Sequence, residues 1–413
     1  MGAKLGKYFV LYGAHGLKLF SFIILIPLFT KIFPKSLWGQ VLIVQALALW
    51  LQMVIEYGFN LSATRGMARV RNDTDALSAL ASGVIGAKII LAVIVIVIAF
   101  FVASFVPAFH GLGNLVFWST LFAVVQGFNP IWYFMATDQF GKYALIDFAS
   151  RASYLLLCFF LIKSQGDAYK IFGVGILTGI FTCFLGYERM YRQMKFKAPS
   201  RIESIAALRD GASLFFFMAA TSIYTTLNLP ILGSSQPSAV VAAYGTSDRI
   251  VRATSGLLEP LNRIVYARLS YLYKNKFEDA IKFLRTAALI VILGGLILFI
   301  SFEILSPLLI KIVAPSYPEA VKYIRGLLIV VPIVAINNVL GFHVMLPLGL
   351  DKAFNTIFIS VSVISALAML VLTPRFGTYG MTLVTISTEV LACLAMLYFI
   401  RSSGVLLRKT VAR

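Results

Sequence analysis

The chain has 413 residues, of which 60% are hydrophobic and only 13% are charged, and its formal net charge is +19. Soluble domains contain about 25% charged residues, and a single core rarely grows beyond ~250–300 residues, so this composition excludes a water-soluble globule. The basic residues fall between apolar segments and form no DNA- or RNA-binding motif, so we expect no nucleic-acid partner.

Apolar segments long enough to cross a bilayer recur along the whole chain. A transmembrane helix needs roughly 20 apolar residues, and about twelve segments approach this length. They cover residues 8–33, 37–57, 82–106, 115–135, 144–162, 171–187, 211–232, 239–260, 283–310, 324–347, 354–373 and 378–400. The sequence therefore predicts an all-α polytopic membrane protein with about twelve transmembrane helices.

The first span carries a polar face. Tyr8, Tyr12, His15 and Lys18 follow one another at steps of four, three and three residues, which places them on one side of a helix. A cation inside a span is costly unless it is paired or hydrated, so Lys18 is a candidate for binding an anionic substrate in a polar cavity. The alternative is that its long side chain reaches the cytoplasmic headgroups.

The second and third spans add an acid and a second lysine. Glu56 ends an apolar run and is followed by Arg65, Arg69 and Arg71, which marks a cytoplasmic exit and makes Glu56 a candidate for ion coupling. Lys88 lies in the third span, about 9 Å from its start. It is a second candidate for substrate binding, with headgroup contact again the alternative.

The longest polar connection, residues 188–210, falls at the middle of the chain. It divides the sequence into an N-terminal half, 1–200, and a C-terminal half, 201–413, each with six expected helices. Lys and Arg are about threefold more frequent in connections on the side of the N-terminus than in the others. We therefore expect both termini to face the cytoplasm.

The seventh span offers uncharged polar groups. Tyr224 and Asn228, together with Thr221 and Thr225, precede Pro230. Such groups are candidates for contacting sugar hydroxyls of a substrate. Hydrogen bonds between neighbouring helices are the alternative, and they are the commoner use of such residues in membrane proteins.

The eighth span has the richest pattern, a single stripe of Tyr244, Asp248, Arg252, Ser255, Glu259 and Arg263. Asp248–Arg252 and Glu259–Arg263 are acid-first pairs four residues apart, so the partners can neutralise each other. Arg249 lies outside both pairs. Because a guanidinium group binds phosphate bidentately, Arg249 and Arg252 are the preferred substrate-binding cations, and Asp248 is a candidate for ion coupling.

The last span contains Glu389 on one face with Thr382, Thr385 and Cys393. Such an acid is a candidate for carrying a proton, and the alternative is a hydrogen-bonded structural residue.

No motif for catalysis or for a bound cofactor is visible. Cys158, Cys183 and Cys393 lie inside apolar segments and are interpreted as packing residues. No cluster of His, Cys, Asp and Glu has metal-ligand spacing, and the G-x-x-x-x-G-K-[ST] phosphate loop is absent. We therefore expect no metal, no cofactor and no enzymatic activity.

Several segments closely resemble the bacterial O-antigen flippases of the multidrug/oligosaccharidyl-lipid/polysaccharide exporter superfamily. They are E-Y-G-F-N-L-S-A-T-R at 56–65, G-F-N-P-I-W-Y-F at 127–134, G-A-S-L-F-F-F at 211–217, Y-G-T-S-D-R-I-V-R at 244–252 and E-P-L-N-R at 259–263. The resemblance implies two six-helix lobes around a central cavity that opens alternately to either side of the bacterial inner membrane.

The resemblance also implies a cargo, an undecaprenyl-pyrophosphate-linked oligosaccharide moved from the cytoplasmic to the periplasmic leaflet for O-antigen assembly. Membrane lipids, an O-antigen polymerase and a chain-length regulator are the expected partners. Such a headgroup cannot cross hydrocarbon unaided, because each unsatisfied hydroxyl costs at least about 2 kcal/mol. Two alternatives remain: a proton- or sodium-coupled drug or cation antiporter of the same superfamily, and a scaffold for glycan-assembly enzymes that does not transport.

Overall fold

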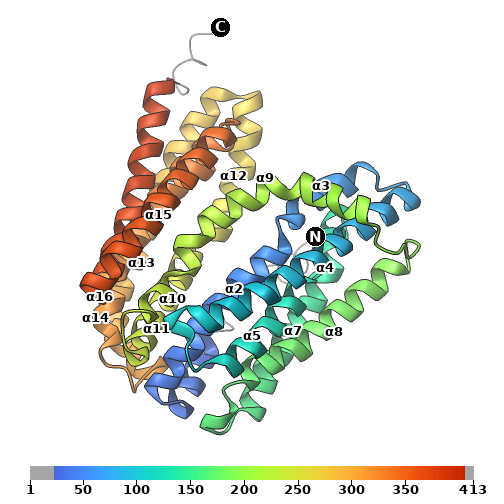
Figure 1. Cartoon of the computed structure of the whole chain (residues 1–413). Coiled ribbons are helices and arrows are strands. Elements are labelled where there is room, and N and C mark those ends of the chain that lie inside the picture. Colours follow the sequence, from blue (N-terminus) through green and yellow to red (C-terminus); the bar gives the residue numbers. More distant parts are fainter. Residues whose placement is uncertain (1–22, 405–413) are drawn as a thin grey trace. The chain divides into compact units, whose positions relative to one another are not determined.

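Helices make up nearly all of the fold (Figure 1). The computed structural model describes residues 23–404, apart from five side chains of one helix at positions 217, 220, 221, 223 and 224, and this range contains no strand. The chain divides into two compact units, Met1–Val241 and Ala242–Arg413, here named the N-terminal unit and the C-terminal unit. Eight of the described helices are long and apolar enough to cross a membrane.

The N-terminal unit begins, in the described range, with an apolar helix at Ile23–Ile32. It continues with α2 (Lys35–Glu56), α3 (Phe59–Arg69), α4 (Thr74–Phe105), α5 (Gly113–Gly127), α6 (Ile131–Ala136), α7 (Phe140–Leu161), α8 (Lys170–Tyr191), α9 (Arg201–Thr226) and α10 (Asn228–Gly233). The next helix, α11 (Ser238–Gly256), begins in this unit and continues into the C-terminal unit.

Two spans of the N-terminal unit are broken into unequal helices. Between α2 and α3 the backbone turns left-handed at Tyr57 (φ 46°) and Gly58 (φ 74°), a conformation that glycine adopts readily and tyrosine rarely. Between α5 and α6 the chain passes through Asn129 and Pro130. Proline lacks an N–H group and so cannot continue the helical hydrogen-bond ladder.

The two breaks lie against each other. A Cβ atom on Gly127 would stand 2.7 Å from the side chain of Ile55, so the end of α5 packs tightly on the end of α2. Beyond the breaks, the hydroxyl of Thr64 in α3 donates a hydrogen bond to the carbonyl of Trp132 in α6, at 3.0 Å. The short helices α3 and α6 therefore pair with each other after the longer helices end.

The C-terminal unit contains the rest of α11, then α12 (Glu259–Asn275), α13 (Phe277–Val313), α14 (Ala320–Leu328), α15 (Val330–Asn338), the π-helix η3 (Val339–Met345) and α16 (Asp351–Ser403). The last of these contains two spans, because its backbone leaves the helical region at Gly377 (φ 57°). Ser365 and Thr388 share a hydrogen bond of 2.6 Å, so the two halves of α16 pack side by side.

The described helices coincide with the expected spans from the second to the twelfth, while the first lies mostly outside the described residues. Within the polar connection 188–210, α8 continues to Tyr191 and α9 begins at Arg201, so residues 192–200 lie between the two helices. The division into halves at residues 200/201 stays a prediction, and the compact units meet at a different point, Val241/Ala242.

Candidate functional site

Lys88 of α4 is fully buried, with 0% of its surface exposed. Its ammonium group donates hydrogen bonds to the carbonyl oxygens of Gly127 (2.7 Å) and Asn129 (3.2 Å), and it lies 6.0 Å from the centre of the Trp132 ring. Its identified hydrogen-bond and ring partners all belong to the broken span α5–α6. This burial argues against a direct contact between Lys88 and a substrate, which was the role expected from its position in the sequence.

The break at Pro130 explains why a lysine is tolerated there. The last carbonyl groups of a helix have no partner within the helix and carry a partial negative charge. The Gly127 carbonyl at the end of α5 and the Asn129 carbonyl in the break lie beside α4, where Lys88 supplies both hydrogen-bond donors and positive charge. The lysine and the break therefore stabilise each other.

Glu56 ends α2 beside this buried lysine. Its two carboxylate oxygens accept hydrogen bonds from the side-chain amides of Gln52 (2.7 Å) and Asn60 (3.3 Å), one from each side of the break between α2 and α3. The carboxylate is close enough for its charge to act on Lys88. We name Gln52, Glu56, Asn60 and Lys88 the N-terminal cluster.

On α11 the expected ion pair is present. Arg252 Nε lies 2.7 Å from Asp248 Oδ2, and the aspartate is buried whereas 41% of the arginine side chain is exposed. Arg249, the next residue after the aspartate, is half-buried. These three residues place two guanidinium groups and one carboxylate within about one and a half turns of helix.

Glu389 of α16 joins this group from another helix. Asn337 of α15 donates through Nδ2 to Glu389 Oε2 (2.8 Å) and to the Glu389 carbonyl (3.0 Å). Arg252 lies close enough to interact electrostatically with Glu389. We name Asp248, Arg249, Arg252, Asn337 and Glu389 the C-terminal cluster.

The side-chain amide of Asn337 can form a hydrogen bond with Glu389 whether the carboxyl group is ionised or protonated. Its nitrogen donates to the carboxylate, while Oδ1 is buried and, among the described residues, has no hydrogen-bond donor. Since oxygen and nitrogen of an amide exchange places by a rotation, the same side chain can accept a hydrogen bond from a protonated carboxyl group. Sequence reasoning did not identify Asn337 as the partner of Glu389.

The remaining expected residues are placed as follows. Lys18 lies outside the described residues, and so does the side chain of Tyr224. Asn228 is buried at the start of α10, where its Oδ1 accepts a hydrogen bond from the backbone N–H of Leu229 (2.9 Å). That contact stabilises the beginning of a short helix. Within the described residues, no group of three or more His, Cys, Asp or Glu side chains could hold a metal ion.

Comparison with known proteins identifies a family and a fold. The model of a family described as "Polysaccharide biosynthesis protein" matches residues 5–272. A protein of Escherichia coli (strain K12) named "Putative O-antigen transporter" is 28% identical over 376 residues, covering 88% of each chain. A protein of the same name from Shigella dysenteriae is 25% identical over 394 residues, covering 94% of this chain and 97% of the relative.

Two solved structures share the fold. One is the lipid II flippase MurJ in an inward closed conformation, with a TM-score of 0.72, 13% identity and coverage of 98% of this chain and 89% of that one. The other is an inward-facing multidrug resistance MATE family transporter of the MOP superfamily, with a TM-score of 0.67, 14% identity and coverage of 95% and 100%. These likenesses confirm the predicted all-α polytopic fold class.

Proposed function

Since the chain belongs to the polysaccharide biosynthesis protein family, we propose that it is a flippase for an undecaprenyl-pyrophosphate-linked oligosaccharide, the O-antigen repeat unit. The relatives named as O-antigen transporters support this cargo, and they extend over most of this chain and most of their own length. The cargo moves from the cytoplasmic to the periplasmic leaflet of the inner membrane by alternating access. An O-antigen polymerase and a chain-length regulator act on it afterwards.

The observation that carries this proposal is the exposed arginine of the C-terminal cluster. Arg252 keeps 41% of its side chain exposed while Asp248 fixes its orientation, and the half-buried Arg249 lies three residues earlier on the same helix. A guanidinium group held in this way is suited to a pyrophosphate, because its fork of N–H donors matches two phosphate oxygens. We assign Arg249 and Arg252 to the pyrophosphate.

Other expected residues take supporting roles in this proposal. Lys88 acts indirectly by holding the break between α5 and α6, and Glu56 holds the break between α2 and α3. Tyr224 contacts the sugars, and Lys18 on the polar face of the first span binds an anionic group of the cargo. Asn228, which is buried, acts indirectly by holding the start of α10. Both termini face the cytoplasm, in agreement with the distribution of Lys and Arg along the sequence.

Glu389 couples protonation to cargo binding. The charges of Arg249, Arg252, Asp248 and an ionised Glu389 sum to zero, and protonation of Glu389 leaves one positive charge. Anion binding and proton uptake at Glu389 therefore favour each other. Movement outward is driven by the membrane potential, since a pyrophosphate with about two negative charges gains roughly 4–5 kcal/mol across 100 mV.

The test replaces the two arginines in a strain that depends on this chain for O-antigen. Arg249→Ala and Arg252→Ala should each reduce surface O-antigen, and the double variant should reduce it at least tenfold, while the protein remains at normal levels in the membrane. Arg263→Ala is the matched control, because Arg263 forms the same type of acid-first pair with Glu259 on α12. Normal O-antigen in the double variant would refute the assigned site.

The same strains separate the proposal from drug export. Susceptibility to cationic drugs should be unchanged when the chain is deleted, because a site built around two arginines disfavours a cationic cargo. A loss of drug resistance together with normal O-antigen would instead identify an antiporter.

A further inference from the structure

The height of α4 in the membrane can be read from its exposed side chains. From Ile89 to Phe105, large apolar residues are exposed at nearly every turn, as expected for a helix surface that faces hydrocarbon. Ser82 lies seven residues before Ile89, which is about 10 Å along the helix axis. Ser82 is therefore at the level of the lipid headgroups, on the side where Arg69 ends α3 and Arg71 lies in the loop before α4.

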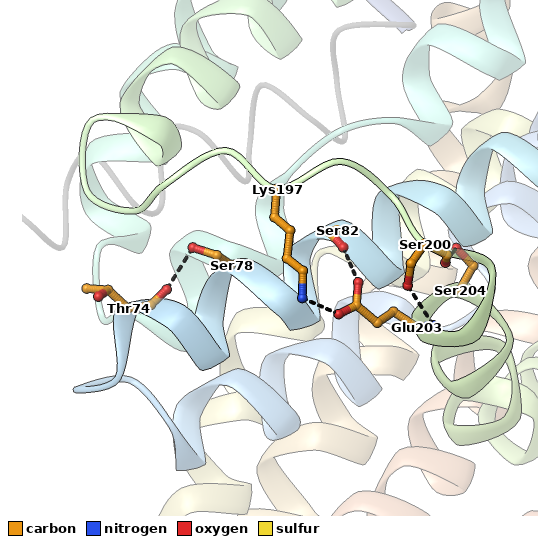
Figure 2. A network of polar contacts seen from close by, with 7 residues as sticks. All are labelled: Thr74, Ser78, Ser82, Lys197, Ser200, Glu203 and Ser204. Carbon is orange, nitrogen blue, oxygen red and sulfur yellow. Dashed lines mark hydrogen bonds and ion pairs between the residues drawn. The ribbon is translucent and has the colours of Figure 1, made fainter.

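A polar network attaches the beginning of α9 to α4 at this level (Figure 2). One carboxylate oxygen of Glu203 accepts a hydrogen bond from the hydroxyl of Ser82 (2.6 Å), and the other pairs with the ammonium group of Lys197 (2.5 Å). Beside them, Gly83 leaves no room for a side chain, since a Cβ there would lie 2.7 Å from the carbonyl oxygen of Glu203. The network fixes which side of α9 faces the protein.

Large apolar residues are exposed in the segment just before α9 and on the opposite side of its first turns. Phe196 is 70% exposed, Ile202 is 84% exposed and Ile205 is 51% exposed. Phe196 also contacts the ring of Tyr191 at the end of α8, with centroids 5.4 Å apart. Exposed apolar side chains next to a tyrosine are typical of the boundary between hydrocarbon and headgroups.

Cations surround these apolar residues. Arg189, Arg192, Lys195, Arg201 and Arg209 are all exposed in the same stretch of chain. Acids pair with some of the cations: Glu203 pairs with Lys197, Glu188 with Arg192, and Asp75 of α4 lies 4.0 Å from Lys195. Residues 188–210 contain six Lys and Arg side chains and three acids, including the exposed Asp210, so the stretch keeps a net positive charge. A cationic surface with apolar side chains in its middle is complementary to anionic lipid headgroups above hydrocarbon.

We propose that residues 189–209, here named the interfacial segment, bind anionic phospholipid headgroups of the adjacent leaflet while Phe196, Ile202 and Ile205 insert between the acyl chains. The leaflet is the cytoplasmic one in the orientation given under Proposed function. The binding surface does not involve the arginines assigned to the cargo, so each assignment can fail without the other.

Lipid binding is measured on the full chain in detergent by native mass spectrometry, with phosphatidylglycerol or phosphatidylcholine of equal acyl chains added. Arg201→Gln combined with Arg209→Gln should lower the retained phosphatidylglycerol at least threefold and leave phosphatidylcholine unchanged. The control, Lys311→Gln with Arg375→Gln, removes the same charge from exposed positions that the orientation given under Proposed function assigns to periplasmic loops, and it should retain phosphatidylglycerol. Equal retention in all variants, or an equal loss in the control, overturns the proposal.

Insertion is measured separately with spin labels in lipid nanodiscs that contain phosphatidylglycerol. A label at Ile202→Cys should collide more often with oxygen, which concentrates in hydrocarbon, than with a water-soluble nickel chelate. A label at Lys195→Cys should show the reverse. If both positions are equally accessible to the nickel chelate, the surface faces water or a protein partner and the assignment to lipid is wrong.

Discussion

The N-terminal and C-terminal clusters contain similar residues and use them differently. In the N-terminal cluster, a lysine is completely buried and its identified hydrogen bonds go to backbone carbonyls. In the C-terminal cluster, an arginine is held by an aspartate and still exposes 41% of its side chain. A cation inside a membrane protein can thus either stabilise a helix break or bind an anionic substrate. Its hydrogen-bond partners and its exposed fraction indicate which of the two roles it has.

The comparison predicts opposite consequences for stability and for transport. Loss of the buried cation should destabilise the fold, because it leaves backbone carbonyls without donors. Loss of the exposed cation should leave the fold intact and abolish binding of the cargo. Lys88→Met and Arg252→Met test this difference directly. Glu389→Gln then tests the C-terminal cluster alone, and Glu203→Gln tests an ion pair outside both clusters, in order of decreasing expected effect.

The largest effect is expected at Lys88. Lys88→Met removes the charged donor from the carbonyls of Gly127 and Asn129, and we expect a loss of about 2–3 kcal/mol in the free energy of unfolding. Arg252→Met removes the ion pair with Asp248, four residues away on the same helix. Because the arginine is partly exposed, this should lower the free energy of unfolding by less than about 1 kcal/mol. Thermal unfolding in detergent measures both, and a greater loss for Arg252→Met would reverse the roles given to the two clusters.

A smaller effect is expected at Glu389. Because an ionised Glu389 opposes anion binding, undecaprenyl pyrophosphate should bind more weakly to the protein as pH rises through the titration of this group. Glu389→Gln keeps a hydrogen-bonding partner for Asn337 and cannot ionise, so binding should become independent of pH in that range. Lipid retention measured at several pH values checks this, with Glu303→Gln as the control, and an unchanged pH dependence in Glu389→Gln would contradict the coupling role.

The smallest effect is expected at Glu203, which lies outside the membrane-spanning part of α9. Hydrogen bonds from Lys197 and Ser82 lower its pKa below the usual value of 4.5. A lowered pKa stabilises the fold at pH above 4.5, and this contribution disappears as pH falls through the lowered value. Glu203→Gln should therefore be less stable than the wild type at pH 7, by under about 1 kcal/mol, and closer to it at pH 3. A difference that does not change with pH would show that the ion pair contributes nothing.

The spans could be predicted well because the number of consecutive apolar residues is read directly from the sequence. It also predicted the Asp248–Arg252 pair, since residues four apart on a helix are neighbours. It did not predict that Lys88 would meet the carbonyls of Gly127 and Asn129, 39 and 41 residues later, nor that Asn337 would meet Glu389. Those contacts depend on how separate helices pack, which the sequence of a single span does not show. Pro130 in the fourth span indicates a helix break and therefore backbone carbonyls without helical partners, but not which side chain meets them.

The first turns of α9 were missed for a different reason. Residues 201–210 are polar and precede the apolar segment of the seventh span. Hydropathy therefore predicted a connection there, although α9 begins at Arg201. Their helical form depends on Glu203 and Ser204 facing α4, where Gly83 and Gly86 permit close approach.

The most direct test is the binding of undecaprenyl pyrophosphate to the purified full chain, compared between the two clusters under conditions in which every variant is folded. Arg249→Ala with Arg252→Ala should weaken binding at least tenfold, whereas Lys88→Met should bind as tightly as the wild type. Loss of binding in Lys88→Met, with normal binding in the double arginine variant, would place the anion at the N-terminal cluster and contradict the account.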